Sequence, residues 1–166
     1  MPTPTYDLIS TTTLAAATSS VTFSGFPTDG TYRDLVLVAS VTNPSGGTSN
    51  VNIRFNGDSG ANYNHVSIFG TGSAATQSGS NTTNSINFPL GGTENIGSIV
   101  SQIMDYSATD KHKTFLTRIA DKGGYGDYVI AAASRWANTS TVTSVTVFGT
   151  ANFQIGNIFN LYGIAA

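Results

Sequence analysis

The chain contains 166 residues, of which seven are Lys or Arg and nine are Asp or Glu, and its formal net charge is −2. This charged fraction of 10% is well below the roughly 25% that is usual in soluble domains, so hydroxyl and amide side chains must supply most of the polar surface. Seven basic residues are too few for the positive field that nucleic-acid binding requires. The absence of cysteine excludes a disulfide framework, a thiol nucleophile and a cysteine-ligated metal.

The length and a hydrophobic fraction of 39% suit one sizeable core, which predicts a single domain over residues 1–166. The first residues lack a basic region followed by an apolar one, and no run approaches the roughly 18 apolar residues of a membrane helix. We therefore expect neither export nor membrane insertion. Residues 1–5 contain two prolines and little to bury, so they are predicted to form an extended arm that a neighbouring subunit orders.

Short runs of alternating apolar and polar residues, separated by clusters of Gly, Asn, Ser, Thr and Asp, predict half-buried strands joined by turns. The clearest run is 51–55, which ends in Asn56-Gly57, a pair that tolerates the positive φ of a tight turn. The same pattern predicts strands over residues 6–10, 20–23, 32–41, 63–69, 85–90, 96–106, 113–120, 128–134, 142–148 and 158–164. Residues 11–19 are the one segment that could hold a helical turn, and their threonines favour one only weakly.

This series of short strands predicts an all-β protein, a jelly-roll-like β-sandwich of about ten short antiparallel strands. The continuous apolar run 35–39 predicts a central strand that is covered on both faces. Residues 70–84 are low in complexity and contain little to bury, which predicts a long surface loop. Such a loop would be either a contact arm ordered by a neighbour or a disordered excursion.

Charge is unevenly distributed along the chain. Residues 59–93 and 136–166 contain no charged residue, whereas residues 105–135 contain nine. One interpretation is that the charged segment is the solvated edge of the sandwich, where charges also oppose edge-to-edge aggregation. The alternative is that it docks on a partner while the neutral stretches pack against copies of the same chain.

No motif predicts a catalytic or metal site. Gly57-Asp58-Ser59-Gly60 resembles the nucleophile loop of chymotrypsin-like proteases, but both histidines, His65 and His112, follow the serine, and a turn explains the tetrapeptide. Two isolated histidines lack the spacing of a zinc site, and no calcium-loop pattern occurs. The glycines of residues 123–126 lack the Lys-Ser/Thr ending of a phosphate loop. We expect no catalytic residue, no cofactor and no metal.

Two pairs of aspartates could in principle serve a glycosidase. They are Asp105 with Asp110 and Asp121 with Asp127. Each aspartate lies in a turn-rich segment, so solvated turn residues are the favoured interpretation.

Aromatic residues in turn-rich segments are the remaining candidates for a site. Their faces can stack on sugar rings or fill a pocket of a protein partner. The candidate partner or glycan contacts are Tyr63, Tyr125 and Trp136. Core packing is the alternative for each of them, and Trp136 is the first residue to substitute.

Several segments resemble small all-β virion proteins of tailed bacteriophages, and the likeness extends over nearly the whole chain. The segments are Tyr-Asp-Leu-Ile-Ser at 6–10, Ser-Val-Thr-Phe at 20–23, Tyr-Arg-Asp-Leu-Val-Leu-Val at 32–38, Ile-Arg-Phe-Asn-Gly-Asp at 53–58, Asn-Tyr at 62–63, Ile-Met-Asp-Tyr at 103–106 and Phe-Asn-Leu-Tyr-Gly-Ile at 159–164. The resemblance implies a capsid decoration (cement) protein or a module of a tail appendage, usually trimeric, which is made in the cytoplasm of the infected bacterium. It brings no catalytic residues.

The function expected from the sequence is therefore structural. The chain is predicted to be a homotrimeric decoration protein on the outer capsid surface of the virion, where it binds the major capsid protein and not nucleic acid or membrane. The alternative is a tail-associated receptor- or glycan-binding module that uses Tyr63, Tyr125 and Trp136.

Overall fold

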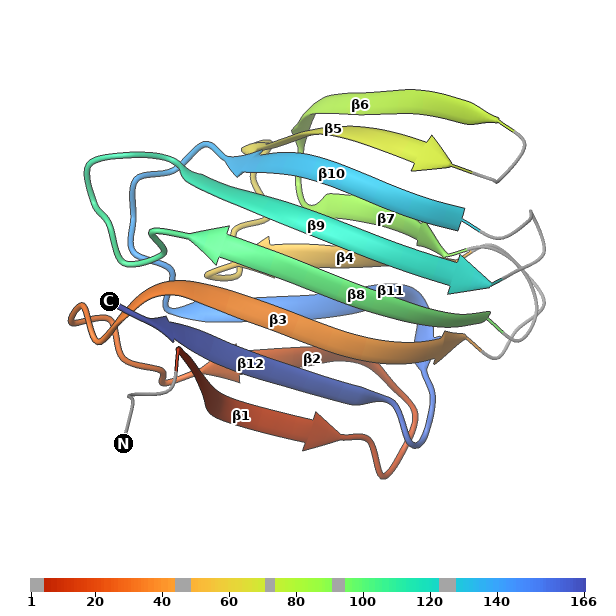
Figure 1. Ribbon diagram of the computed structural model, residues 1–166, viewed down its shortest axis with the longest axis horizontal. Coiled ribbons are helices and arrows are strands. Elements are labelled where there is room, and N and C mark those ends of the chain that lie inside the picture. Colours follow the sequence, from red (N-terminus) through yellow and green to blue (C-terminus); the bar gives the residue numbers. More distant parts are fainter. Residues whose placement is uncertain (1–4, 44–48, 71–73, 91–94, 123–127) are drawn as a thin grey trace.

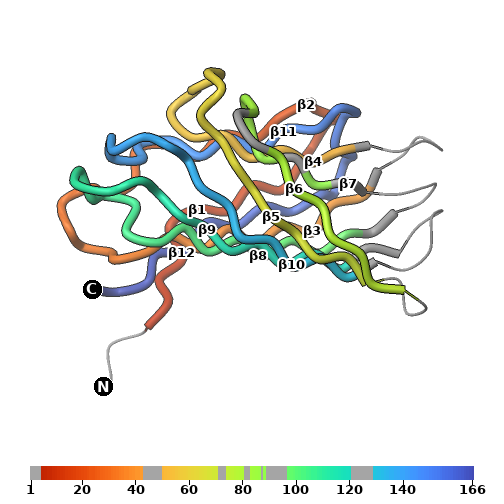
Figure 2. The backbone as a smooth tube through the Cα atoms, turned by 90° about the horizontal axis from the view of Figure 1, so that it is seen from above, coloured from red at the N-terminus to blue at the C-terminus, as the bar shows by residue number. Residues whose placement is uncertain are grey.

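The computed structural model describes residues 5–43, 49–70, 74–90, 95–122 and 128–166. These residues form twelve strands and no helix, and every strand pairing is antiparallel. The strands build two sheets, which Figure 2 shows as separate layers. The predicted all-β sandwich is confirmed.

The larger sheet has eight strands in the order β1-β12-β3-β8-β9-β10-β5-β6 (Figure 1). Their bounds are β1 Tyr6–Thr13, β12 Ile158–Ala165, β3 Tyr32–Asn43, β8 Asn95–Met104, β9 Lys113–Lys122, β10 Tyr128–Trp136, β5 Tyr63–Gly70 and β6 Ala75–Thr83. The smaller sheet has the order β2-β11-β4-β7. Its strands are β2 Thr18–Ser24, β11 Ser144–Phe153, β4 Ser49–Phe55 and β7 Ile86–Leu90.

The order of the strands follows a nested pattern in which early strands pair with late ones. β1 pairs with β12, β2 with β11, β3 with β8 and β4 with β7. This is the arrangement of one long antiparallel hairpin rolled into two four-stranded sheets, which defines a jelly roll. The hairpins β5–β6 and β9–β10 are additions that extend one sheet beyond β8.

The core lies between the two sheets and explains the alternating sequence pattern, since successive side chains of a strand point to opposite faces. In β4, Val51, Ile53 and Phe55 are buried in one continuous cluster that includes residues from both sheets. The buried aromatic residues of this cluster are Phe23, Phe26, Phe55, Tyr63, Phe88, Tyr106, Phe115, Trp136, Phe153 and Phe159.

The predicted Asn-Gly turn after β4 is confirmed. Asn56 and Gly57 have φ values of 52° and 67°, and the Asp58 amide donates to the Phe55 carbonyl at 2.8 Å. The Asn56 side chain fastens this turn to the start of β11, because its Oδ1 accepts from the amides of Thr143 and Ser144 at 2.8 and 3.1 Å. The turn therefore holds the two neighbouring strands of the smaller sheet in register.

Two local predictions are wrong, and a third holds only in part. Much of the predicted loop 70–84 is β6, which pairs with β5 through its backbone although its side chains bury little. The predicted helical turn in 11–19 is the end of β1, a short connection and the start of β2. The run 35–39 lies in the central strand β3, where its inner face meets the other sheet; on its outer face Val36 is buried and Val38 is half-buried, so the predicted cover of both faces holds in part. The arm 1–5 lies outside the described residues apart from Thr5.

Candidate interaction surface

The outer face of the larger sheet, which points away from the smaller one, exposes large apolar side chains. Inward positions of β5, β9 and β10 are occupied by core residues, so the alternate residues point outward. Among these, Val66 and Ile68 of β5 are 62% and 61% exposed, Leu116 of β9 is 50% exposed and Val129 of β10 is 64% exposed. Single exposed apolar residues are ordinary, but neighbouring ones mark an interaction site.

Strand register places these side chains in rows that cross the sheet, because directly paired residues share a face. One row runs over seven strands and contains Leu8, Tyr162, Val36, Gln102, Leu116, Ala133 and Val66. The row beside it contains Asn160, Val38, Val100, Arg118, Ala131 and Ile68. We call these two rows the outer band.

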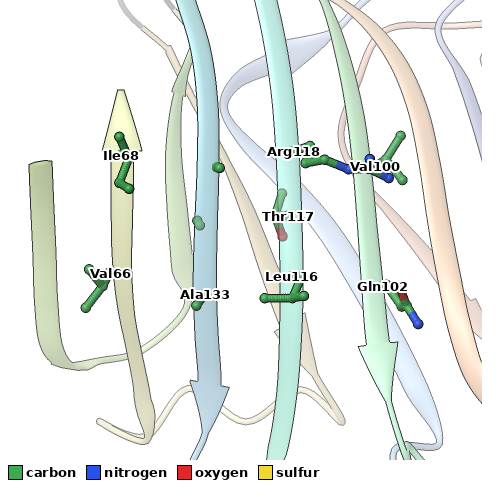
Figure 3. A pocket seen from close by; sticks show the side chains of 10 residues that line it. Val66, Ile68, Val100, Gln102, Leu116, Thr117, Arg118 and Ala133 are labelled. Atoms are coloured by element: carbon green, nitrogen blue, oxygen red, sulfur yellow. The ribbon is translucent and has the colours of Figure 1, made fainter. Parts of the chain in front are cut away.

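The outer band is hollowed where it crosses β10. Ala133 pairs with Val66 on one side and Leu116 on the other, while Ala131 pairs with Ile68 and Arg118. The small alanine side chains thus form part of the floor of a groove of about 610 Å³ that extends from Val66 and Ile68 of β5, past Leu116 and Arg118 of β9, to Val100 and Gln102 of β8. In Figure 3, Leu116 points toward β10 from one side of this groove, and Val66 and Ile68 stand on the other.

Polar groups in the outer band are few, and most of them are hydrogen-bonded within the chain. Gln102 donates to the Asp34 carboxylate at 2.9 Å, and Asn160 accepts from Thr11 at 2.8 Å. Arg118 has no hydrogen-bond or ion-pair partner among the described residues, and Figure 3 shows its side chain directed toward Val100 on β8, away from the alanine floor. Arg118 is the one ionised side chain in the two rows, and the Asp34 carboxylate that Gln102 contacts lies beside them on β3.

The aromatic residues predicted as contacts are not part of this surface. Tyr63 and Trp136 are 0% and 1% exposed, and their rings stack within the core at 6.4 Å between centroids. The prediction that they contact a partner or glycan is therefore wrong for this pair, because the alternation of β5 and β10 directs both side chains between the sheets. Tyr125 lies outside the described residues.

Asp58 supports the buried Trp136 from the turn after β4. The Trp136 Nε1–H donates to Asp58 Oδ2 at 2.7 Å, and Asn62 Nδ2 and the Gly60 amide donate to the same carboxylate at 2.9 and 2.8 Å. Burial acts to raise the pKa of Asp58, but these hydrogen bonds outweigh it and the pKa is lowered from 3.8. The tetrapeptide 57–60 is thus a structural turn whose aspartate orients the tryptophan.

This geometry predicts an acid dependence of stability. Because the native pKa of Asp58 is below its unfolded value of 3.8, the carboxylate stabilises the fold above that pH, and the contribution is lost as the pH falls through the native pKa. We expect Asp58→Asn to cost about 1 kcal/mol at pH 7, a small value because the site is partly exposed, and to cost less at pH 3, which lies below the unfolded pKa. Urea unfolding of both proteins at the two pH values measures the difference. An equal cost at both would contradict the assignment.

The charged segment 105–135 is not uniformly solvated. Lys113 of β9 is 0% exposed, and its Nζ donates to the carbonyls of Ala108, Lys111 and Thr139 at 2.5, 3.1 and 3.2 Å. Burial lowers the pKa of Lys113. This lysine is therefore a structural bridge between the β8–β9 and β10–β11 connections, whereas Lys111 is exposed and pairs with Asp105 at 3.3 Å.

The interior contains one serine–histidine pair that the sequence analysis did not single out. Ser134 and His65 are cross-strand partners on β10 and β5, and the Ser134 Oγ and His65 Nδ1 are buried without a hydrogen-bond partner. Burial lowers the pKa of His65, and no carboxylate contributes to the shift. A catalytic triad needs a histidine that is hydrogen-bonded to the nucleophile and oriented by a third group. The Ser134 Oγ has no hydrogen-bond partner, so the arrangement of this pair differs from that of a triad.

The two glycosidase candidates are only partly described. Asp105 and Asp110 lie in the β8–β9 connection, and the side chains of Asp121 and Asp127 lie outside the described part of the chain. Within that part, no three His, Asp or Glu side chains are grouped as a metal site would require.

The fold and the surface together define an all-β protein of the jelly-roll type with an apolar outer band on its larger sheet. No protein-family model matches the chain, and no curated protein sequence matches it significantly. No helix among the described residues is long and apolar enough to span a membrane.

Proposed function

We propose that the protein is a virion structural protein of a tailed bacteriophage, and specifically a trimeric decoration protein that binds the major capsid protein on the outer shell. Its action is mechanical. Contacts with several shell subunits bury surface that becomes exposed again when the shell opens, at about 25 cal/mol per Å² of apolar area before entropy is subtracted. Assembly into a trimer multiplies this attachment through effective concentration.

The outer band is the single observation that carries the proposal. The exposed apolar side chains of Val66, Ile68 and Leu116 lie close together on the outer face, which is unusual on a chain that has to remain soluble as a free monomer. Proteins that persist in a stable assembly cover such surface permanently. The low charge of the chain supports the same function, since little charge has to be desolvated when copies or shell subunits meet it.

The resemblance of segments such as 53–58 and 159–164 to phage virion proteins supplies the biological setting of this proposal. It implies assembly in the bacterial cytoplasm and a final location on the particle. The alternative, a receptor- or glycan-binding module at the tail, depended on three aromatic residues, and two of them are buried. Of the three aromatic residues, only Tyr125 can still serve a receptor- or glycan-binding function.

Copy number in the purified virion tests the proposal. The particles to examine are those of the phage whose genome carries this gene, with the ratio of this chain to the major capsid protein measured by quantitative mass spectrometry. We expect a ratio of the same order as the number of shell positions, together with trimeric density on the shell in cryo-electron microscopy. A handful of copies at the tail, or no copies in the particle, would overturn the proposal.

A further inference from the structure

We infer that His65 and Ser134 form an acid-sensitive switch on the inner face of the larger sheet, in which protonation of the histidine loosens the hairpin β5–β6. The same hairpin carries the exposed side chains of Val66 and Ile68 on its outer face. Loosening it therefore removes one flank of the groove over β10. The inference goes beyond the proposed function, because it assigns a means of regulating this surface and concerns the chain on its own.

His65 is packed into the interior with an unpaired ring nitrogen. It alternates with Tyr63 and Ser67, which are 0% and 2% exposed, so its side chain lies on the inner face of β5. The His65 ring centroid lies 6.4 Å from that of Phe88 on β7. The His65 Nδ1 and the Oγ of its cross-strand neighbour Ser134 are both buried without a hydrogen-bond partner. Burying an unpaired polar atom is costly and burying an unpaired charge costs far more, so the fold accepts the neutral imidazole and not the imidazolium.

Among the described residues, no negative charge faces the histidine. Its own strand and the strands β6 and β7 that pack beside it contain no charged residue. On β10, Ser134 supplies only a hydroxyl group, and the one charged side chain is Arg135, which donates to Asn64 Oδ1 at 2.8 Å. Tyr63, two residues along β5, is neutral because burial raises its pKa to about 12. An imidazolium at this position therefore has no carboxylate to offset its charge.

The charged groups of β4 and of the turn after it are engaged elsewhere. The Asp58 carboxylate accepts from the Trp136 Nε1–H, and the Arg54 guanidinium lies over the Phe148 ring at 4.6 Å. Neither contributes to the pKa of His65, which burial lowers from 6.5. Since the unfolded chain holds this proton more tightly, the stability that the neutral histidine provides is complete well above pH 6.5. It falls as the pH drops from 6.5 toward the native pKa.

The position of the hairpin makes this loss a local opening. The strands β5 and β6 are the last two of the larger sheet, and β6 is its edge (Figure 1). Only β10 joins the pair to the rest of that sheet, so an opening at this seam breaks fewer contacts than global unfolding does. It brings the His65 and Ser134 side chains to water, which solvates the charged ring. It also moves Val66 and Ile68 away from Leu116.

Amide hydrogen exchange of the purified full chain at pH 5 and pH 7.5, corrected for intrinsic exchange rates, tests the inference. Asp34 and Asp58, whose pKa values are lowered from 3.8, stay ionised over this range, whereas histidine titrates within it. We expect the protection of amides in β5 and β6 to fall about tenfold at pH 5, while that of β3 and β8 changes by about twofold or less.

Neutral substitutions of His65 remove the switch. His65→Phe keeps an aromatic ring in place but cannot take up a proton, so the protection of β5 and β6 should no longer depend on pH. His65→Gln makes the same test with a polar side chain, so the inference stays testable if one variant does not fold, which circular dichroism reveals. His112→Gln is the matched control, because His112 is exposed in the β8–β9 connection. It should keep the wild-type loss at pH 5.

Three results would overturn the inference. The first is wild-type protection of β5 and β6 that is equal at the two pH values. The second is a loss at pH 5 that the neutral His65 variants retain, and the third is a loss of equal size in β3 and β8. Because the isolated chain is measured, each of these results leaves the proposed capsid function standing, which copy number in the virion tests separately.

Discussion

Replacement of Trp136 by alanine is expected to destabilise the protein by about 3–5 kcal/mol, which is the usual cost of truncating a buried tryptophan. Trp136 is 1% exposed, lies 5.7 Å from Phe55 between ring centroids and stacks on Tyr63. The substitution removes these contacts and leaves the Asp58 carboxylate without its Nε1–H donor. Because a domain of this size is stable by only about 5–15 kcal/mol, chemical denaturation will show a large fall in midpoint.

Trp136→Phe separates packing from hydrogen bonding at the same position. Phenylalanine retains an aromatic ring against Phe55 and Tyr63 but cannot donate to Asp58. We expect a loss of about 1–3 kcal/mol, intermediate between wild type and Trp136→Ala. If Trp136→Ala unfolds at the wild-type denaturant concentration, the tryptophan is not a core residue, and its original interpretation as a contact residue returns.

Replacement of Lys113 by methionine is expected to destabilise the protein by about 2–4 kcal/mol, although methionine is apolar and similar in length. The loss arises because the carbonyls of Ala108, Lys111 and Thr139 lose a charged donor that holds two connections together. Methionine avoids the free-energy cost of burying an ammonium group, and this gain offsets part of the loss of stability. Thermal and urea unfolding measure the net effect.

Lys111→Met is the matched control for this substitution. The Lys111 side chain is 52% exposed and forms one ion pair with Asp105, so its replacement should change stability by about 0.5 kcal/mol or less. The lowered pKa of Lys113 adds a second readout. Since the unfolded chain holds this proton more tightly, wild-type stability should rise with pH between the native pKa and 10.5, and this rise should disappear in Lys113→Met. Equal effects of the two substitutions at neutral pH would contradict the structural role.

The sequence predicts most of the fold because most strands have one buried face. Val51, Ile53 and Phe55 alternate with polar residues, and this pattern locates β4 and its sheet face. The strand β6 could not be found in this way. It is an edge strand in which residues 75–79 are exposed on both faces, so its position is determined by backbone pairing with β5 and not by hydrophobic alternation.

The candidate surface was harder to predict than the fold. Leu116 and Val66 lie far apart in the sequence and become neighbours across Ala133 only through the pairing of β5, β10 and β9. Their outward direction follows from alternation, but neither strand indicates that the other is adjacent. The prediction for Trp136 and Tyr63 failed for another reason. Both residues lie next to turns, which suggests exposure, but strand alternation directs both rings into the core.

The nested strand order determines when during synthesis the molecule can become complete. The hairpins β5–β6 and β9–β10 join residues close in sequence, so they can form while the chain is still emerging from the ribosome. The pairing of Tyr6 with Ile164 closes almost the whole chain and has to wait for its last strand. Until β12 is inserted, β1 and β3 lack a shared neighbour, and the nascent protein exposes open strand edges that β12 then covers on both sides.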